Sequence, residues 1–120
     1  MAIAAQILVA LIMLLHVYFV LLETVLFNTR GRRVFGISAD KAEIIAPLMS
    51  NQGCYNGFLV AALAIGLLHP NPDIARAFLG YGLLCIGVAG IWGAATVKRS
   101  ILYIQTAPAV VALALLHFSR

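Results

Sequence analysis

The chain has 120 residues, of which 63% are hydrophobic and only 10% are charged. An ordinary soluble domain has about 25% charged residues, and a domain this small buries only about 60 to 70% of the surface that its unfolded chain exposes. Lipid must cover the remaining apolar surface, which excludes a water-soluble globular domain. The net charge of +4 does not indicate nucleic-acid binding, because the cations lie at the ends of apolar runs and form no basic helical face.

Apolar runs long enough to cross a bilayer, which takes about 20 helical residues, occur at four places. They cover residues 2–27, 42–68, 74–97 and 101–118. We therefore predict an all-α integral membrane protein, a four-helix bundle that forms a single transmembrane domain over residues 1–120. The first run has no basic leader and ends in a basic cluster, so we expect it to be retained as a helix rather than removed as a signal peptide.

The connections between these spans differ in charge, which predicts their orientation. Six cations lie in the first and third connections: Arg30, Arg32, Arg33, Lys41, Lys98 and Arg99. The positive-inside rule places both of these connections in the cytoplasm and both chain termini outside. We expect the lipids of this membrane to be the protein's partners.

Two connections also carry signals for where helices begin. Asp40 is followed three residues later by Glu43, which resembles a capping box at the start of the second span. The second connection, residues 69–73, contains two prolines that predict a compact turn, after which Asp73 is expected to cap the third helix.

Two ionisable residues lie seven positions apart in the first span, and this spacing of about two turns puts His16 and Glu23 on one face. Such groups are costly at membrane depth and mark candidate functional sites. Glu23 either pairs with an arginine of the first connection, or binds a cation or carries protons. His16 is either a hydrogen-bonded structural residue or a group that exchanges a proton near neutral pH.

The second span contains the densest polar segment, at residues 51–57. Asn51 with Tyr55, and Gln52 with Asn56, form two adjacent rows because each pair is four residues apart. Glycines at positions 53 and 57 form a Gly-x-x-x-Gly pair that allows close approach of another backbone. The amides either hold helices together or bind the polar headgroup of a ligand.

The fourth span begins with Arg99, Tyr103 and Thr106, spaced four and three residues apart. This spacing predicts a polar stripe that projects inward from the cytoplasmic end. Arg99 is either a topological anchor with Tyr103 at the interface, or a group that holds a carboxylate, phosphate or thiolate. Ser100 and Gln105 complete the candidate ligand-binding residues of this segment.

The two remaining features of these spans concern packing. Pro108 predicts a bend in the fourth span, which would leave a carbonyl for a neighbouring polar side chain. The third span is rich in glycine and has few polar groups, which is typical of a packing helix or a subunit contact.

Four short segments carry a resemblance to a known family. They are His-Val-Tyr-Phe-Val at 16–20, Arg-Gly-Arg-Arg-Val-Phe at 30–35, Asn-Gln-Gly-x-Tyr-Asn-Gly-Phe at 51–58, and Gln-x-x-Pro-Ala at 105–109. Together they resemble the bacterial membrane-protein family called domain of unknown function 1304. Members of that family have no agreed activity, so this resemblance implies the architecture and leaves the chemistry open.

A more distant resemblance concerns Arg99, Ser100, Tyr103 and Pro108. They are similar to the start of the fourth helix in the membrane-associated proteins in eicosanoid and glutathione metabolism (MAPEG). This resemblance implies a MAPEG-like homotrimer, glutathione as a cofactor, and catalysis by Arg99 and Tyr103 with Ser100 nearby. Arg99 would stabilise the glutathione thiolate. The second span departs from the MAPEG pattern, because no arginine precedes its asparagines and no glutamate follows them.

Three hypotheses of function remain open. The first is MAPEG-like binding or thiol conjugation of a lipophilic or anionic small molecule at a polar site near the cytoplasmic face, with glutathione transferase-like activity if the protein is an enzyme. The second is a small proton-coupled transporter that uses Glu23 together with His16. The third is a nonenzymatic lipid-binding scaffold. None of the three requires a metal ion or nucleic acid.

Overall fold

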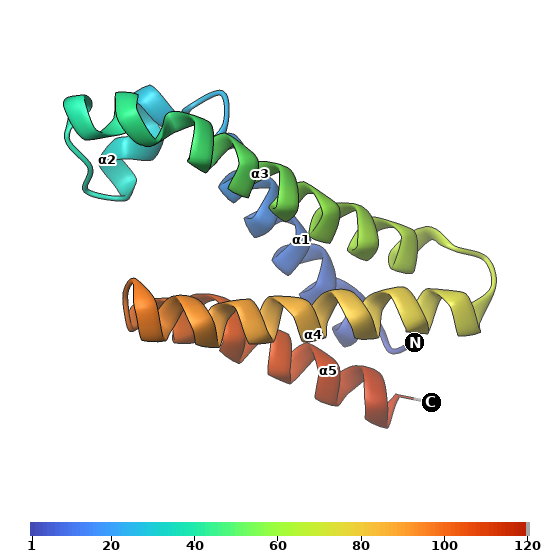
Figure 1. Ribbon diagram of the computed structural model, residues 1–120. Coiled ribbons are helices and arrows are strands. Elements are labelled where there is room, and N and C mark those ends of the chain that lie inside the picture. The colour runs from blue at the N-terminus through green and yellow to red at the C-terminus, as the bar shows by residue number, and fades with distance from the viewer. Residues whose placement is uncertain (120) are drawn as a thin grey trace. The chain divides into compact units, whose positions relative to one another are not determined.

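The computed structural model describes residues 1–119, which form helices and turns without a strand (Figure 1). The elements are α1 (Ile3–Glu23), η1 (Phe27–Gly31), α2 (Arg32–Val34), α3 (Ala39–Leu68), α4 (Pro72–Thr96), η2 (Leu102–Thr106) and α5 (Ala107–Phe118). η1 and η2 are π-helical turns, in which an N–H bonds to the carbonyl five residues back. The chain divides into two compact units, residues 14–60 and residues 1–13 with 61 onward.

Three of the helices, α1, α3 and α4, are long and apolar enough to cross a membrane. The prediction of an all-α protein with membrane-like helices is thus confirmed for the first three spans. The fourth expected span, at 101–118, consists of five residues of η2 and twelve of α5. At about 1.5 Å per residue this helix is about 25 Å long, shorter than a typical hydrocarbon core of about 30 Å.

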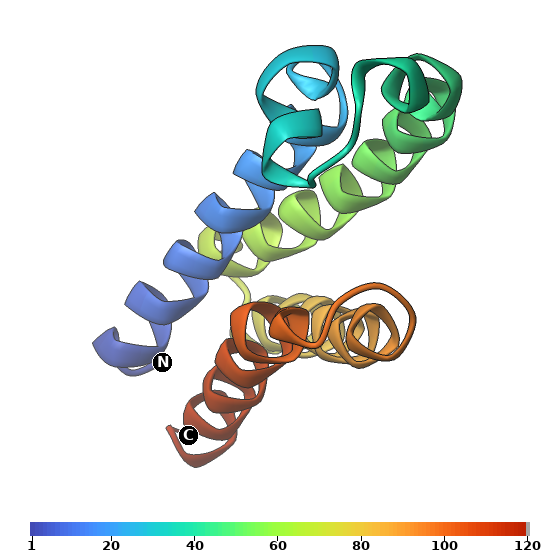
Figure 2. The same cartoon turned by 90° about the vertical axis from the view of Figure 1, so that its left-hand side faces the viewer.

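The first span ends earlier than its hydropathy indicates. α1 stops at Glu23, and the chain continues through a turn into η1 and α2, which lead into the start of α3 (Figure 2). The Gly31 N–H donates to the Leu26 carbonyl over 2.7 Å. A Cβ at Gly31 would overlap the carbonyl oxygen of Leu22. The wide turn therefore depends on a glycine at this position.

The start of α3 differs from the predicted capping box. The hydroxyl oxygen of Ser38 accepts the Lys41 N–H over 3.4 Å, and the Ser38 carbonyl accepts the Ala42 N–H over 2.9 Å. Asp40 instead lies in the first turn of α3. The capping-box prediction is wrong because the helix begins before Asp40. Gly36, with φ of 69°, permits the preceding turn.

The start of α4 differs in the same way. Asn71 is the N-cap residue, and its Oδ1 accepts the N–H groups of Asp73 over 2.9 Å and Ile74 over 3.2 Å. The prediction that Asp73 caps this helix is wrong. Pro72 fits the first helical position, so the helix begins one residue before Asp73. The negative charge of Asp73 lies in the first turn, where it is favourable.

The predicted glycine surface of the third span is a packing surface in the unit that includes residues 61 onward. Gly82, Gly87 and Gly90 are buried on α4. A Cβ at Gly82 would lie 3.1 Å from a Leu63 methyl group, and one at Gly87 would lie 3.9 Å from the Ala109 Cβ. These glycines therefore let α4 approach α3 on one side and α5 on the other.

Candidate functional site

Glu23 and Asn56 meet in the unit of residues 14–60. Glu23 is the last residue of α1 and is only 6% exposed, and Asn56 lies half-buried on α3. The Asn56 Nδ2 donates a hydrogen bond of 2.5 Å to Glu23 Oε1. Both residues were candidates from the sequence, and the structure joins them across 33 residues of chain.

Close backbone approach positions this contact. A Cβ at Gly53, on the turn of α3 before Asn56, would lie 2.6 Å from the Thr24 methyl group and 3.3 Å from the Glu23 Cβ. The Thr24 hydroxyl donates to the Val20 carbonyl, so its methyl group is left to face Gly53. A Cβ added at Gly57 would meet no atom of another segment within 4 Å. Only Gly53 of the Gly-x-x-x-Gly pair makes a close contact within this unit.

The arginines expected as partners of Glu23 bond elsewhere. The Arg30 Nε donates to the Tyr18 hydroxyl over 2.6 Å, and its guanidinium carbon lies 5.6 Å from the centre of that ring. The Arg32 Nε donates to the carbonyl of Asn28 over 3.1 Å. Within residues 1–119, the contact found for the Glu23 carboxyl is therefore an amide and not an arginine.

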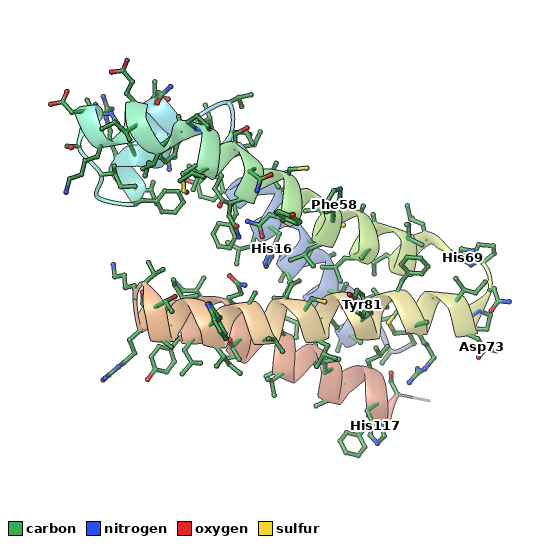
Figure 3. The ribbon with its side chains drawn as sticks, viewed as in Figure 1. His16, Phe58, His69, Asp73, Tyr81 and His117 are labelled. Carbon is green, nitrogen blue, oxygen red and sulfur yellow. The ribbon has the colours of Figure 1, made fainter. Side chains whose placement is uncertain are left out.

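The other candidates of the first two spans make different contacts. His16 on α1 (Figure 3) is fully buried. Its ring meets the Phe19 ring edge to face, with 5.2 Å between the ring centres. Asn51 and Gln52 are exposed on α3, and Tyr55 is exposed beside Phe58, with a distance of 5.8 Å between the ring centres. Of the two predicted polar rows, only the position of Asn56 reaches α1.

The candidates of the fourth span belong to the other unit. Arg99 is exposed in the turn before η2, Ser100 is half-buried, and Tyr103 is 68% exposed. Thr106 is buried, so the predicted stripe is divided between two faces. The Ala107 N–H bonds to the Leu102 carbonyl, and this wider π-helical turn changes which residues share a face.

Polar groups of η2 bond to the backbone of α4. The Gln105 Nε2 donates to the Ile86 carbonyl over 3.2 Å, and the Thr106 hydroxyl donates to the Gly87 carbonyl over 3.0 Å. These bonds hold η2 against α4. The side-chain nitrogen of Gln105 therefore takes part in helix packing within the chain.

Comparison with known proteins gives one match. A family model described as protein of unknown function (DUF1304) matches residues 10–117. The chain belongs to this family. The predicted membership of the DUF1304 family is thus confirmed. No curated protein and no solved structure matches the chain.

This DUF1304 protein also has a pocket that the motifs did not predict. It has a volume of about 680 Å³ and lies in the unit of residues 1–13 and 61 onward. Asp73 and Arg76 line it, together with His69 and Gln6. The sequence signal was the spacing of Asp73 and Arg76, three residues apart at the start of a helix, which puts opposite charges on one side. Among the described residues, no group of three His, Cys, Asp or Glu side chains is placed to hold a metal ion.

Proposed function

We propose that this DUF1304 protein is a multi-pass protein of the bacterial inner membrane that binds a lipophilic small molecule through Glu23 and Asn56, near the cytoplasmic face. The observation that carries the proposal is the buried carboxyl at the end of a candidate span, bonded to an amide. The Asn56 amide bonds to Oε1, and the second oxygen, Oε2, remains as an acceptor for a ligand donor. Intramembrane carboxyls that are not used for topology are functional candidates.

The charge of the first connection supports the cytoplasmic placement. Arg30, Arg32 and Arg33 follow Glu23 within ten residues, and cations cluster on the cytoplasmic side of membrane proteins. In this proposal the Leu102–Phe118 helix is the fourth span and both termini lie outside. Its shorter length is compatible with local thinning of the bilayer.

The chemistry of the site defines the class of ligand. A hydroxyl, amide or ammonium group of the ligand donates to the Glu23 carboxyl, and its lipophilic part lies against the aromatic rings of Tyr55 and Phe58 on α3. The Asn56 side chain holds the carboxyl in place through its 2.5 Å bond. Preorganised polar groups surrounded by apolar and aromatic side chains are typical of small-molecule sites.

The exposed amides on α3 support an oligomer. Asn51 and Gln52 are exposed on a helix that is long enough to span the membrane. Polar groups facing hydrocarbon are costly, and amides form hydrogen bonds between neighbouring helices. In the MAPEG-like form of the proposal, three copies assemble and cover these side chains. In that form, Arg99 and Tyr103 of the other unit stabilise the thiolate of glutathione, and this thiolate adds to an electrophilic carbon–carbon double bond of a lipophilic substrate, whose second carbon takes up a proton.

Native mass spectrometry of the detergent-purified protein tests the binding proposal. We expect the protein to retain a lipophilic small molecule or added glutathione, and we expect Glu23→Gln to lower the bound fraction about tenfold, as loss of a hydrogen bond to a charged group does. Glu43→Gln is the matched control, since Glu43 is exposed near the start of α3. Equal retention by both variants would contradict the proposed site.

The same spectra test the role of Arg99 in glutathione binding and the number of copies in the assembly. Loss of glutathione, but not of the lipophilic ligand, in Arg99→Ala would support thiol conjugation, whereas retained glutathione would remove Arg99 from the site. A trimer mass would support the MAPEG-like assembly, and a dimer mass would contradict it.

A second function is supported by the same carboxyl. A small proton-coupled transporter needs an intramembrane acid that is not neutralised by a fixed cation, and Glu23 contacts an amide rather than an arginine within residues 1–119. In proteoliposomes containing a pH-sensitive dye, Glu23→Gln should abolish any substrate-driven proton flux that the wild-type protein shows. Flux that persists in Glu23→Gln would exclude Glu23 as the proton carrier, and binding without flux would leave a lipid-binding scaffold.

A further inference from the structure

The pocket at the turn between α3 and α4 brings opposite charges to one place. Gln6, His69, Asp73 and Arg76 line it together with Gly66, Leu67 and two prolines. Figure 3 shows His69 and Asp73 at this turn. Because α3 ends at Leu68 and α4 begins at Pro72, the pocket lies at the ends of two candidate spans, which is the depth of lipid headgroups.

Arg76 is held in place by the end of another helix. Its Nη2 donates to the Leu116 carbonyl over 2.6 Å, in the last turn of α5. That carbonyl lies at a helix end, where carbonyls need partners from outside the helix, and it also accepts the Ser119 hydroxyl over 3.4 Å. A guanidinium has five N–H donors, and four remain for a ligand. Arg76 therefore offers a positioned, half-buried anion-binding group.

The helix start beside it does not serve as a second anion site. Asn71 Oδ1 already accepts the N–H groups of Asp73 and Ile74, and the Asn71 carbonyl accepts that of Ala75. Asp73 also brings a negative charge into the pocket. The pocket thus offers a guanidinium and a carboxylate together, and a zwitterion can bond to both.

A second pocket continues from the same two charges. It has a volume of about 400 Å³, and Asp73 and Arg76 line it together with Ala77, Leu113, Leu116 and His117. Ala77 of α4, together with Leu113 and Leu116 of α5, provides an apolar surface in this second pocket. A ligand with a zwitterionic head and a hydrocarbon chain matches this sequence of surfaces.

We propose that Asp73 and Arg76 form a binding site for the phosphoethanolamine headgroup of a membrane lipid. The phosphate accepts hydrogen bonds from Arg76, since guanidinium groups bind phosphate with paired donors. The primary ammonium donates to the Asp73 carboxylate. The acyl chain follows Leu113 and Leu116. This site lies in a different unit from Glu23 and Asn56 and is independent of the function proposed for them.

The first arm of the test separates the ammonium contact from the phosphate contact. Binding of short-chain phosphatidylethanolamine and short-chain phosphatidylglycerol to the full-length protein is measured by native mass spectrometry. Asp73→Asn should weaken phosphatidylethanolamine binding about tenfold and change phosphatidylglycerol binding less than about twofold, because only the first lipid has an ammonium group. Asp40→Asn is the matched control, since Asp40 also lies in the first turn of a helix. Equal effects of Asp73→Asn on both lipids, or no effect on either, would overturn the proposal.

The second arm tests the phosphate contact and the source of the ligand. Arg76→Gln should weaken both lipids about tenfold or more, whereas Arg32→Gln, which also loses a bond to a backbone carbonyl, should weaken neither. Inorganic phosphate should not compete at equal concentration. Competition by inorganic phosphate as strong as that of the lipid would replace the lipid with a free anion as ligand. If circular dichroism shows Arg76→Gln unfolded, Asp73→Asn decides between the outcomes alone.

Discussion

Two polar contacts between helical segments of this protein differ in their chemistry. In the unit of residues 14–60, Asn56 donates to the side chain of Glu23. In the other unit, Thr106 donates to the backbone carbonyl of Gly87. Each pair joins two helical segments. The two acceptors differ in their remaining atoms, because a carboxyl group has a second oxygen and a backbone carbonyl does not.

The Thr106 contact is complete within the fold. The Thr106 hydroxyl has one proton to donate, and it donates this proton to the Gly87 carbonyl. The hydroxyl of Thr106 also occupies the place where a Cβ at Gly90 would be, so the contact is part of close packing. Glu23 has a second carboxyl oxygen and is held by one amide. Glu23 therefore keeps an acceptor atom that the Thr106 contact lacks, and for this reason we propose the ligand site at the carboxyl.

The close packing of Gly90 against Thr106 predicts the largest effect on the free energy of unfolding. Gly90→Val places branched carbons against the Thr106 hydroxyl and its backbone nitrogen, and we expect the free energy of unfolding to fall by about 3 kcal/mol from overpacking. Thermal unfolding in detergent, followed by circular dichroism, measures it. Gly80→Val is the control on the same helix, since no atom lies within 4 Å of a Cβ there. A similar loss in both variants would show that helix propensity, rather than the Thr106 contact, sets the cost.

The bond between Asn56 and Glu23 predicts a smaller effect on the free energy of unfolding. Asn56→Leu removes the donor to Glu23 and leaves a buried carboxyl without it, which should lower the free energy of unfolding by about 1 to 3 kcal/mol. In a detergent that keeps the protein monomeric, Asn51→Leu, on the exposed side of α3, should change it by less than about 0.5 kcal/mol. Unfolding of both variants in that detergent measures the difference. A loss for Asn51→Leu as large as that for Asn56→Leu would contradict a stabilising role of the Glu23 bond.

The sequence predicted the long spans because they depend only on local composition. The runs that became α1, α3 and α4 are apolar over lengths that a bilayer requires, and no tertiary information is needed to see them. The ends of the helices were less predictable. Ser38 and Asn71 compete for the cap with nearby acids, and the position of Pro72 decides one of these cases.

The site was predictable as a set of residues but not as a pair. Asn51, Gln52 and Asn56 are alike in sequence, and which one meets Glu23 depends on the rotation of α3 about its axis. The close contact of Gly53 with Thr24 fixes that rotation, and it is a tertiary property. The division of the polar stripe at Tyr103 and Thr106 likewise follows from the π-helical turn η2. Pro108, two residues after that turn, was the sequence signal for irregular winding.

The smallest effect separates a buried hydroxyl bond from an exposed one. Thr106→Val keeps the shape of the side chain and removes its bond to the Gly87 carbonyl, which should lower the free energy of unfolding by about 0.6 kcal/mol, and by no more than about 1.7 kcal/mol. Thr96→Val is the matched control, because the exposed Thr96 hydroxyl bonds only to the Trp92 carbonyl of its own helix. The control should show no loss, since valine suits an exposed helical position about as well as threonine. A loss for Thr106→Val as large as that for Asn56→Leu would remove the distinction between the two contacts. The carboxyl could then no longer be singled out as a ligand site on the strength of its bonding.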